Sequence, residues 1–202
     1  MSHALRTMTA TGHFQVLTEL LSKLEATEQA GTALSLDQAA AQAVQAIVDV
    51  ARTSNKIMLI GNGGSAAIVG HMQNDLSKAV GVRAMTFTEP SLMTALSNDE
   101  GYGSVFEHPI RLWANPGDLL IAVSSSGRSE NILRGVRACH ARGGRTITLS
   151  GFKADNPLRK LGVVNFYVPS EVYGHVESVH GVLTHLLTDH AMQAWSMLKA
   201  GA

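Results

Sequence analysis

The sequence contains almost no cysteine. Of its 202 residues, only Cys139 carries a thiol. A single cysteine excludes a disulfide within the chain and a cysteine-rich zinc site, and it is typical of a protein in a reducing compartment. We therefore expect a cytoplasmic protein.

Net charge is also absent. Sixteen Lys and Arg residues balance sixteen Asp and Glu residues, and charged residues make up only 16% of the chain. A chain with zero net charge has no global basic field to attract nucleic acid or an acidic membrane surface. We expect neither as a partner, and any bound anion must be held by local groups.

Long apolar runs are missing as well. Residues 1–21 have scattered polar positions, so they predict neither a signal peptide nor a membrane span. The five prolines are dispersed, and no repeat, low-complexity tract or proline-rich linker divides the chain. With 45% hydrophobic residues, the chain can nevertheless bury a substantial core.

The first fifty residues show helical periodicity. Apolar residues recur at helical spacing over 14–30, and a second such stretch covers 36–51 after the cap candidates Ser35 and Asp37. Gly31 separates the two stretches. We therefore predict an N-terminal helical hairpin, in an extension over residues 1–54 that packs on the rest of the protein and on partners.

After Asn55 the pattern changes to short apolar runs that end in Gly, Ser or Pro. Each run is too short for a helix and too apolar for a half-exposed strand, as expected for strands buried on both faces of a parallel sheet. The runs cover 57–60, 119–123, 146–149 and 163–168, with a further strand candidate at 84–87, and helical stretches cover 66–78, 129–142 and 172–199. This alternation predicts an α/β domain over residues 55–202, with a doubly wound, mostly parallel five-stranded sheet flanked by helices.

Two polar turns follow strands of this predicted sheet. In open α/β sheets, ligands bind where a strand ends and a loop enters the next helix. The first turn, GNGGS at 61–65, allows close backbone approach, and Ser65 adds a hydroxyl. The second turn, SSSGRS at 124–129, offers four hydroxyls and free N–H groups at a helix start, which suits a phosphate monoester. Neither turn has the spacing of a dinucleotide fingerprint or of a P-loop, so we predict a phosphate site.

Histidine is frequent, with nine residues. His71 and Asp75 stand at i and i+4 on the helix after the first turn, so they share a face and can chelate a metal or act as an acid–base pair. On the last helix, Glu177 pairs most simply with His180 at i+3. His185 lies about 12 Å further along the axis than Glu177 and about 80° around it. Helix geometry alone therefore leaves both His180 and His185 open.

These motifs together resemble the SIS (sugar isomerase) domain family. The GNGGSA turn followed by His71 and Asp75, the segment at 97–99, the SSSGRS turn and the histidine-rich last helix are similar to those of its phosphoheptose isomerase branch. The resemblance implies the SIS fold and an isomerase that interconverts sedoheptulose 7-phosphate and D-glycero-D-manno-heptose 7-phosphate through an enediol. It also implies a homotetramer with active sites at the subunit interfaces.

The resemblance also implies roles for single residues. Asp75 and His185 match the family's acid–base pair, which favours His185 over His180. A zinc site is implied at His71, Asp75, Glu177 and His185. With Ser65 included for its hydroxyl, the candidate phosphosugar ligands are Asn62, Gly63, Gly64, Ser65, Asn98, Asp99, Ser124, Ser125, Ser126 and Ser129.

The sequence departs from the family pattern at four positions. Asp75 replaces a Glu, Glu177 replaces a Gln, Ala79 stands where a substrate-contacting Arg is usual, and Gly174 stands where Asp is common. The lost Arg and the shorter acid leave open another phosphosugar, such as an octose phosphate. A SIS protein that binds a protein partner without catalysis is a further alternative. Such relatives lack the acidic residue on the first site helix, whereas this chain retains Asp75.

Overall fold

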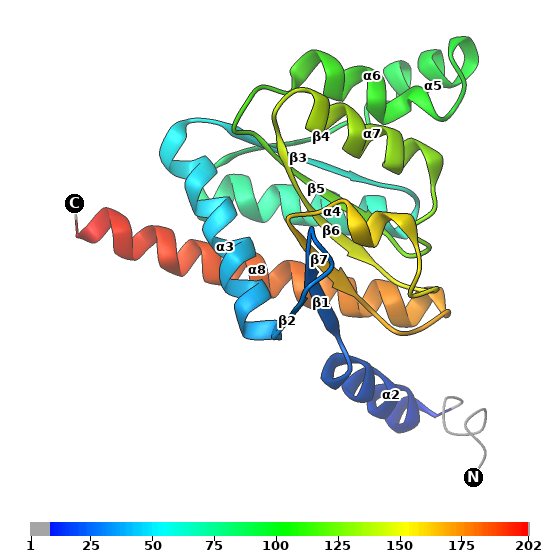
Figure 1. Cartoon of the computed structure of the whole chain (residues 1–202), viewed down its shortest axis with the longest axis vertical. Coiled ribbons are helices and arrows are strands. Elements are labelled where there is room, and N and C mark those ends of the chain that lie inside the picture. Colours follow the sequence, from blue (N-terminus) through cyan, green and yellow to red (C-terminus); the bar gives the residue numbers. More distant parts are fainter. Residues whose placement is uncertain (1–8, 202) are drawn as a thin grey trace.

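Seven strands form one sheet in the computed structural model, which describes residues 9–201 (Figure 1). Their order is β2-β1-β7-β6-β5-β3-β4. Five of them pair in parallel and confirm the five predicted strands. These are β3 (Lys56–Gly61), β4 (Arg83–Thr86), β5 (Leu119–Ser124), β6 (Arg145–Ser150) and β7 (Val164–Tyr167).

The parallel strands are buried on both faces because their apolar side chains alternate between two cores. Along β3, Ile57 and Leu59 belong to one core, whereas Met58 and Ile60 belong to the other. The sheet therefore lies between two helical layers, as predicted for a doubly wound fold. The first layer holds α2 (Ala10–Ser22), α3 (Leu36–Thr53), α4 (Gly64–Asp75) and α8 (Tyr173–Ala200), and the second holds α5 (Pro90–Asp99), α6 (Ser104–Trp113) and α7 (Glu130–Ala141).

The three helices predicted after Asn55 are confirmed as α4, α7 and α8, with small shifts at their ends. A π-helical turn, η1 (Leu76–Val80), continues α4, and a 3₁₀ turn, η2 (Pro157–Lys160), precedes β7. Helices α5 and α6 were not predicted. Among residues 9–201, no helix is long and apolar enough to cross a membrane.

The predicted N-terminal helical hairpin is wrong. Helix α2 ends at Ser22, and a β-hairpin of β1 (Glu25–Glu28) and β2 (Ala33–Leu34) lies between α2 and α3. Strand β1 pairs antiparallel with β7, which gives the sheet seven strands instead of five. A sheet edge presents unpaired N–H and C=O groups, and β1 pairs with those of β7. This pairing is between residues far apart in sequence, so the local helical pattern did not reveal it.

The second predicted N-terminal helix is confirmed as α3. Ser35 caps it in a reciprocal pair with Gln38, because each side chain accepts a hydrogen bond from the other residue's main-chain N–H. Ala39, Ala43 and Ile47 are fully buried in the core that also holds Ile57 and Leu59 of β3. Residues 1–8 of the predicted extension lie outside the described residues, and the boundary at residue 54 stays a prediction.

A buried carboxylate ties the starts of β3 and β5 together. Asp118 is 1% exposed and accepts hydrogen bonds from the main-chain N–H of Lys56 (3.0 Å) and of Asn115 (2.7 Å) and from Asn55 Nδ2 (3.2 Å). The Lys56 ammonium lies 2.5 Å from its Oδ2. Burial alone would raise the pKa of Asp118, but these donors outweigh it and hold the pKa below its usual value.

Asp118→Ala should lower the free energy of unfolding by about 3 kcal/mol, because it leaves the Lys56 ammonium without its buried partner. Since the folded-state pKa is lowered, the stabilisation is fully present above the unfolded-state pKa of about 3.9 and is lost as the pH falls through the folded-state value. Urea unfolding at neutral and acid pH measures both effects. The control is Asp49→Ala, which removes a half-exposed ion pair with Arg145 and should cost no more than about 1 kcal/mol. Equal losses in the two variants would contradict this account.

Candidate functional site

The candidate site is built on α4 and α8, which lie side by side and run in the same direction. Gly64, at the start of α4, lies against Glu177 near the start of α8, and a Cβ on Gly64 would overlap the Glu177 carboxylate. Further along both helices, Asp75 lies beside His185. The two helices share one apolar core, which includes Val69, Met72, Val176, Val179 and Leu183.

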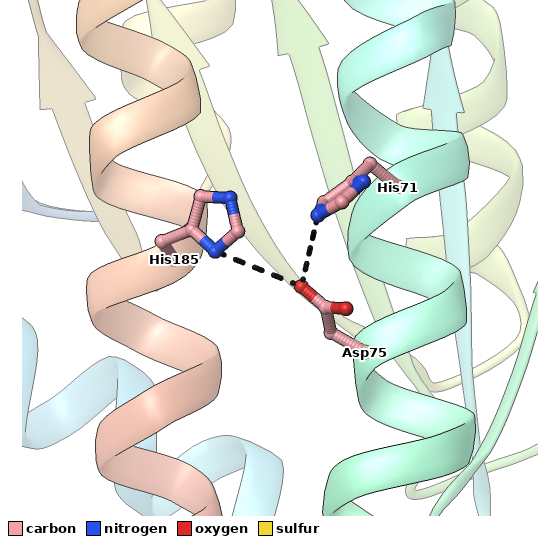
Figure 2. A group of neighbouring side chains, drawn as sticks. All are labelled: His71, Asp75 and His185. Carbon is pink, nitrogen blue, oxygen red and sulfur yellow. Dashed lines mark ion pairs between the residues drawn. The ribbon is translucent and has the colours of Figure 1, made fainter.

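Three polar side chains gather at the far end of this helix pair (Figure 2). Asp75 Oδ2 lies 3.3 Å from His71 Nε2 and 3.7 Å from His185 Nδ1. One ligand atom from each residue lies within 4.8 Å of the other two. Two imidazoles and a carboxylate form a donor set for a divalent transition metal. The side chains of His71 and His185 are 57% and 56% exposed, so this His–Asp–His cluster is open to solvent.

A cavity of about 100 Å³ lies at the other end of the helix pair, where the two polar turns meet. Its walls are mostly hydroxyls: Asn62, Ser65, Ser124, Ser125, Ser126, Ser129, Tyr173 and Glu177. The buried hydroxyl of Ser125 has no hydrogen-bond partner within residues 9–201. Because a buried polar group without a partner is costly, this hydroxyl is available to hydrogen-bond an oxygen of a ligand in the cavity. We call this space the serine cavity.

A buried asparagine holds the serine turn in shape. Gly127 has a φ of 61°, and a Cβ there would overlap the side chain of Asn156. Asn156 is fully buried, and its Nδ2 donates to Ser150 Oγ and to two main-chain carbonyls. Only glycine fits at this place, because both the backbone conformation and the contact exclude a side chain. The serine turn is therefore rigidly backed by β6 and the loop after it.

The structure separates Glu177 from the three residues with which the resemblance groups it. His71, Asp75 and His185 form the cluster, but Glu177 lies in the wall of the serine cavity. The eight residues between Glu177 and His185 correspond to about 12 Å along the helix axis. The metal site implied by the resemblance therefore has three of its four residues together.

His180 is a core residue. Its imidazole is fully buried, and Nε2 lies 3.2 Å from the main-chain oxygen of Ser150. Burial lowers the pKa of His180 to about 4, so the ring is neutral near pH 7 and Nε2–H donates to that carbonyl. Of the two histidines that helix geometry left open, only His185 lies beside Asp75.

Some predicted ligands do not line the serine cavity. Asn98 and Asp99 lie exposed at the end of α5, where Asn98 Nδ2 donates to Asp99 Oδ1 at 2.8 Å. Gly63 lies in the first turn with a φ of 52°, and Gly64 starts α4. Gly64 lets the backbone and Glu177 approach each other, whereas a Cβ on Gly63 would meet no atom within 4 Å. Neither glycine lines the cavity, but the predicted Asn62 and all the predicted serines do.

Three residues near the cavity were not predicted from the sequence. Tyr173 lines the cavity one helical turn before Glu177, a spacing that places both on one face of α8. Tyr102 and Asn131 both form hydrogen bonds with Asn62. Tyr102 lies between two glycines and Asn131 lies at the start of α7, and neither position predicts a contact with Asn62.

Known proteins share both the sequence pattern and the fold. The SIS domain family matches residues 13–151. The phosphoheptose isomerase of Aquifex aeolicus is 34% identical over 72% of this chain and 82% of its own length, and that of Thiobacillus denitrificans is 32% identical over 88% and 90%. The solved phosphoheptose isomerase of Neisseria gonorrhoeae has a TM-score of 0.73 and 26% identity, covering 89% of this chain and 94% of its own. That of Francisella tularensis, at 24% identity, shares the fold with a TM-score of 0.76 over 96% and 100%.

Proposed function

The chain belongs to the SIS domain family, among the phosphoheptose isomerases, and from this premise we propose that it interconverts sedoheptulose 7-phosphate and D-glycero-D-manno-heptose 7-phosphate. The serine cavity holds the phosphate. The His–Asp–His cluster acts on the C1–C2 end of the sugar, where the carbonyl moves between the two carbons.

The separation of the cavity from the cluster carries this proposal. Glu177 in the cavity wall and His185 in the cluster are about 12 Å apart along α8. An extended chain of seven carbons, with bonds of about 1.5 Å, spans about 8 Å, and a phosphate ester adds about 3 Å. A heptose phosphate therefore reaches from one end to the other, whereas a triose phosphate is too short.

Phosphate recognition relies on neutral donors. Of the residues lining the serine cavity, none is Lys or Arg, and the only one that can carry a charge near pH 7 is the acidic Glu177. The hydroxyl of Ser125, which lacks a partner, and the N–H groups at the start of α7 supply hydrogen bonds, and the positive end of the helix favours an anion. This arrangement agrees with a chain that has no net charge.

Asp75 and His185 carry the proton transfers. One of the two removes the proton from the carbon next to the carbonyl, and the other moves protons between the two oxygens of the resulting enediol. Their facing atoms are 3.7 Å apart, so both reach the same end of a bound sugar. The reaction needs no external oxidant or reductant, because the ketose and the aldose are isomers.

The His–Asp–His cluster fits zinc. His71, Asp75 and His185 would hold the ion through two nitrogens and one oxygen, a donor set typical of zinc enzymes. When bound, zinc would polarise the carbonyl or fix the acid–base pair in place. A site with three protein ligands leaves a position open, so Glu177 is not required as a fourth ligand.

Gly174 favours a second candidate substrate. A Cβ at this position would meet no atom within 4 Å, and its neighbour Tyr173 lines the cavity. Gly174 itself does not line the cavity, so the second candidate, a longer sugar such as an octose phosphate, rests on the missing Asp side chain beside Tyr173 and on Ala79 in place of the family's Arg. The alternative of a SIS protein without catalysis is disfavoured, because Asp75 is retained and lies between two histidines.

Conversion of sedoheptulose 7-phosphate to the aldose should occur when zinc is supplied, and in D₂O the product should carry deuterium because the enediol exchanges protons with solvent. Asp75→Asn should lower kcat by about 10²–10⁴-fold, since it removes an acid–base group. Asp189→Asn, at an exposed position on α8, is the control and should keep full activity. A coupled assay for the aldose measures kcat in the wild type and the variants. Mass spectrometry of the product formed in D₂O detects the deuterium.

Failure of the wild type to produce the aldose would overturn the proposed function. Turnover of an octulose phosphate but not of the heptulose phosphate would select the second candidate. An Asp75→Asn variant with the kcat of the wild type would remove Asp75 from the mechanism.

Zinc affinity should fall at least about tenfold in His71→Ala and in His185→Ala, because each change removes one of three ligands. Competition with a chromophoric chelator measures the affinity without any turnover. His190→Ala is the matched control, since His190 is exposed on α8 outside the cluster. Unchanged affinity in both cluster variants would show that zinc does not bind there.

A homotetramer with sites at subunit interfaces is the expected assembly. Two helices end away from the sheet in Figure 1 and present apolar side chains: Phe14 of α2 is 64% exposed and Met197 of α8 is 73% exposed. Burying such side chains favours association. Native mass spectrometry should give four times the chain mass of 21.4 kDa. A monomer at micromolar concentration would contradict active sites shared between subunits.

The cytoplasmic location of the protein stays a prediction.

A further inference from the structure

Asn62 is held by two residues from outside its own turn. Asn131 Nδ2 donates to Asn62 Oδ1 at 2.8 Å, and Asn62 Nδ2 donates back to Asn131 Oδ1 at 3.0 Å. Tyr102 Oη also donates to Asn62 Oδ1, at 3.1 Å. Asn131 is buried at the start of α7, whereas Tyr102 is half-exposed in the loop between α5 and α6. Three segments that are distant in sequence therefore meet at one amide.

The backbone determines which way these amides point. The main-chain N–H of Ile132 donates to Asn131 Oδ1 at 3.0 Å. Ile132 lies in the first turn of α7, where N–H groups have no partner within the helix. Because a main-chain N–H can only donate, it identifies the oxygen end of the Asn131 amide. The nitrogen end of Asn131 must then face an acceptor, which is Asn62 Oδ1.

These hydrogen bonds leave the Asn62 side chain with one unused hydrogen, on Nδ2. Its Oδ1 has two lone pairs, and Asn131 and Tyr102 occupy both. Its Nδ2 has two hydrogens, and Asn131 accepts only one of them. Asn62 lines the serine cavity. Toward the cavity, therefore, this side chain can only donate.

We propose that Tyr102 is a positioning residue that, with Asn131, makes Asn62 an obligatory hydrogen-bond donor to an oxygen of the phosphosugar. The inference rests on the proposed function and deepens it. Without the Tyr102 hydroxyl, Asn62 Oδ1 would regain a free lone pair beside the anionic ligand. In a cavity whose walls contain no Lys or Arg, a free acceptor lone pair next to the Asn62 donor would repel a ligand oxygen and weaken its binding.

Tyr102→Phe removes only the hydroxyl and keeps the ring. It should raise KM for sedoheptulose 7-phosphate about three- to tenfold, the effect of one hydrogen bond, and leave kcat within about twofold. Tyr167→Phe is the matched control. It removes a hydroxyl that donates to the main-chain oxygen of Phe152, and it should leave both constants unchanged.

A double-mutant cycle separates positioning from a structural role. In an Asn62→Ala background the Tyr102 hydroxyl has no amide oxygen to donate to, so adding Tyr102→Phe should not change KM further. A structural role would instead lower the melting temperature and kcat in both backgrounds.

An unchanged KM in Tyr102→Phe, or an equal increase in the Asn62→Ala background, would overturn the proposal. Absence of turnover in the wild type would instead overturn the proposed function. Calorimetry of phosphosugar binding to the same variants then decides on Tyr102 independently, because an unchanged dissociation constant would refute its role.

Discussion

The parallel packing of α4 against α8 is the constraint on which the whole site depends. Helix α4 starts at the carboxyl end of β3, so its first turn lies at the edge of the sheet where ligands bind. Gly64 lets α8 come close there, and a shared apolar core keeps the helices together further along. Because both helices run the same way, the serine cavity stays at one end of the pair and the His–Asp–His cluster at the other.

This arrangement divides the chemistry between two environments. The serine cavity is lined by hydroxyls, by an amide whose orientation is fixed and by the Glu177 carboxylate, so an anion there depends on neutral donors and on the start of α7. The cluster is open to solvent and groups two imidazoles with a carboxylate. His180 lies on the same helix as His185 but is buried, and its low pKa keeps it neutral and out of the acid–base chemistry. In the proposed function, a sugar phosphate spans both environments, with its phosphate bound at one end and its C1–C2 carbons reacting at the other.

Much of this could be predicted from the sequence, because it depends on local patterns. Buried parallel strands are short apolar runs, and both polar turns follow such runs directly. The errors concern contacts between distant segments. Strand β1 was read as helix because its pairing with β7 is not a local property, and Tyr102 was missed because its contact with Asn62 crosses from another loop. The grouping of Glu177 with the cluster comes from the resemblance alone and stays a prediction, and the helix rise sets Glu177 about 12 Å from His185 along α8.

A crystal structure of the protein with sedoheptulose 7-phosphate tests the central claim most directly. The account predicts the phosphate against Ser124, Ser125 and Ser126, and the C1–C2 end of the sugar beside Asp75 and His185. A sugar bound in the reverse direction, with its phosphate at the histidines, would contradict it, and so would a ligand that occupies only one end of the helix pair.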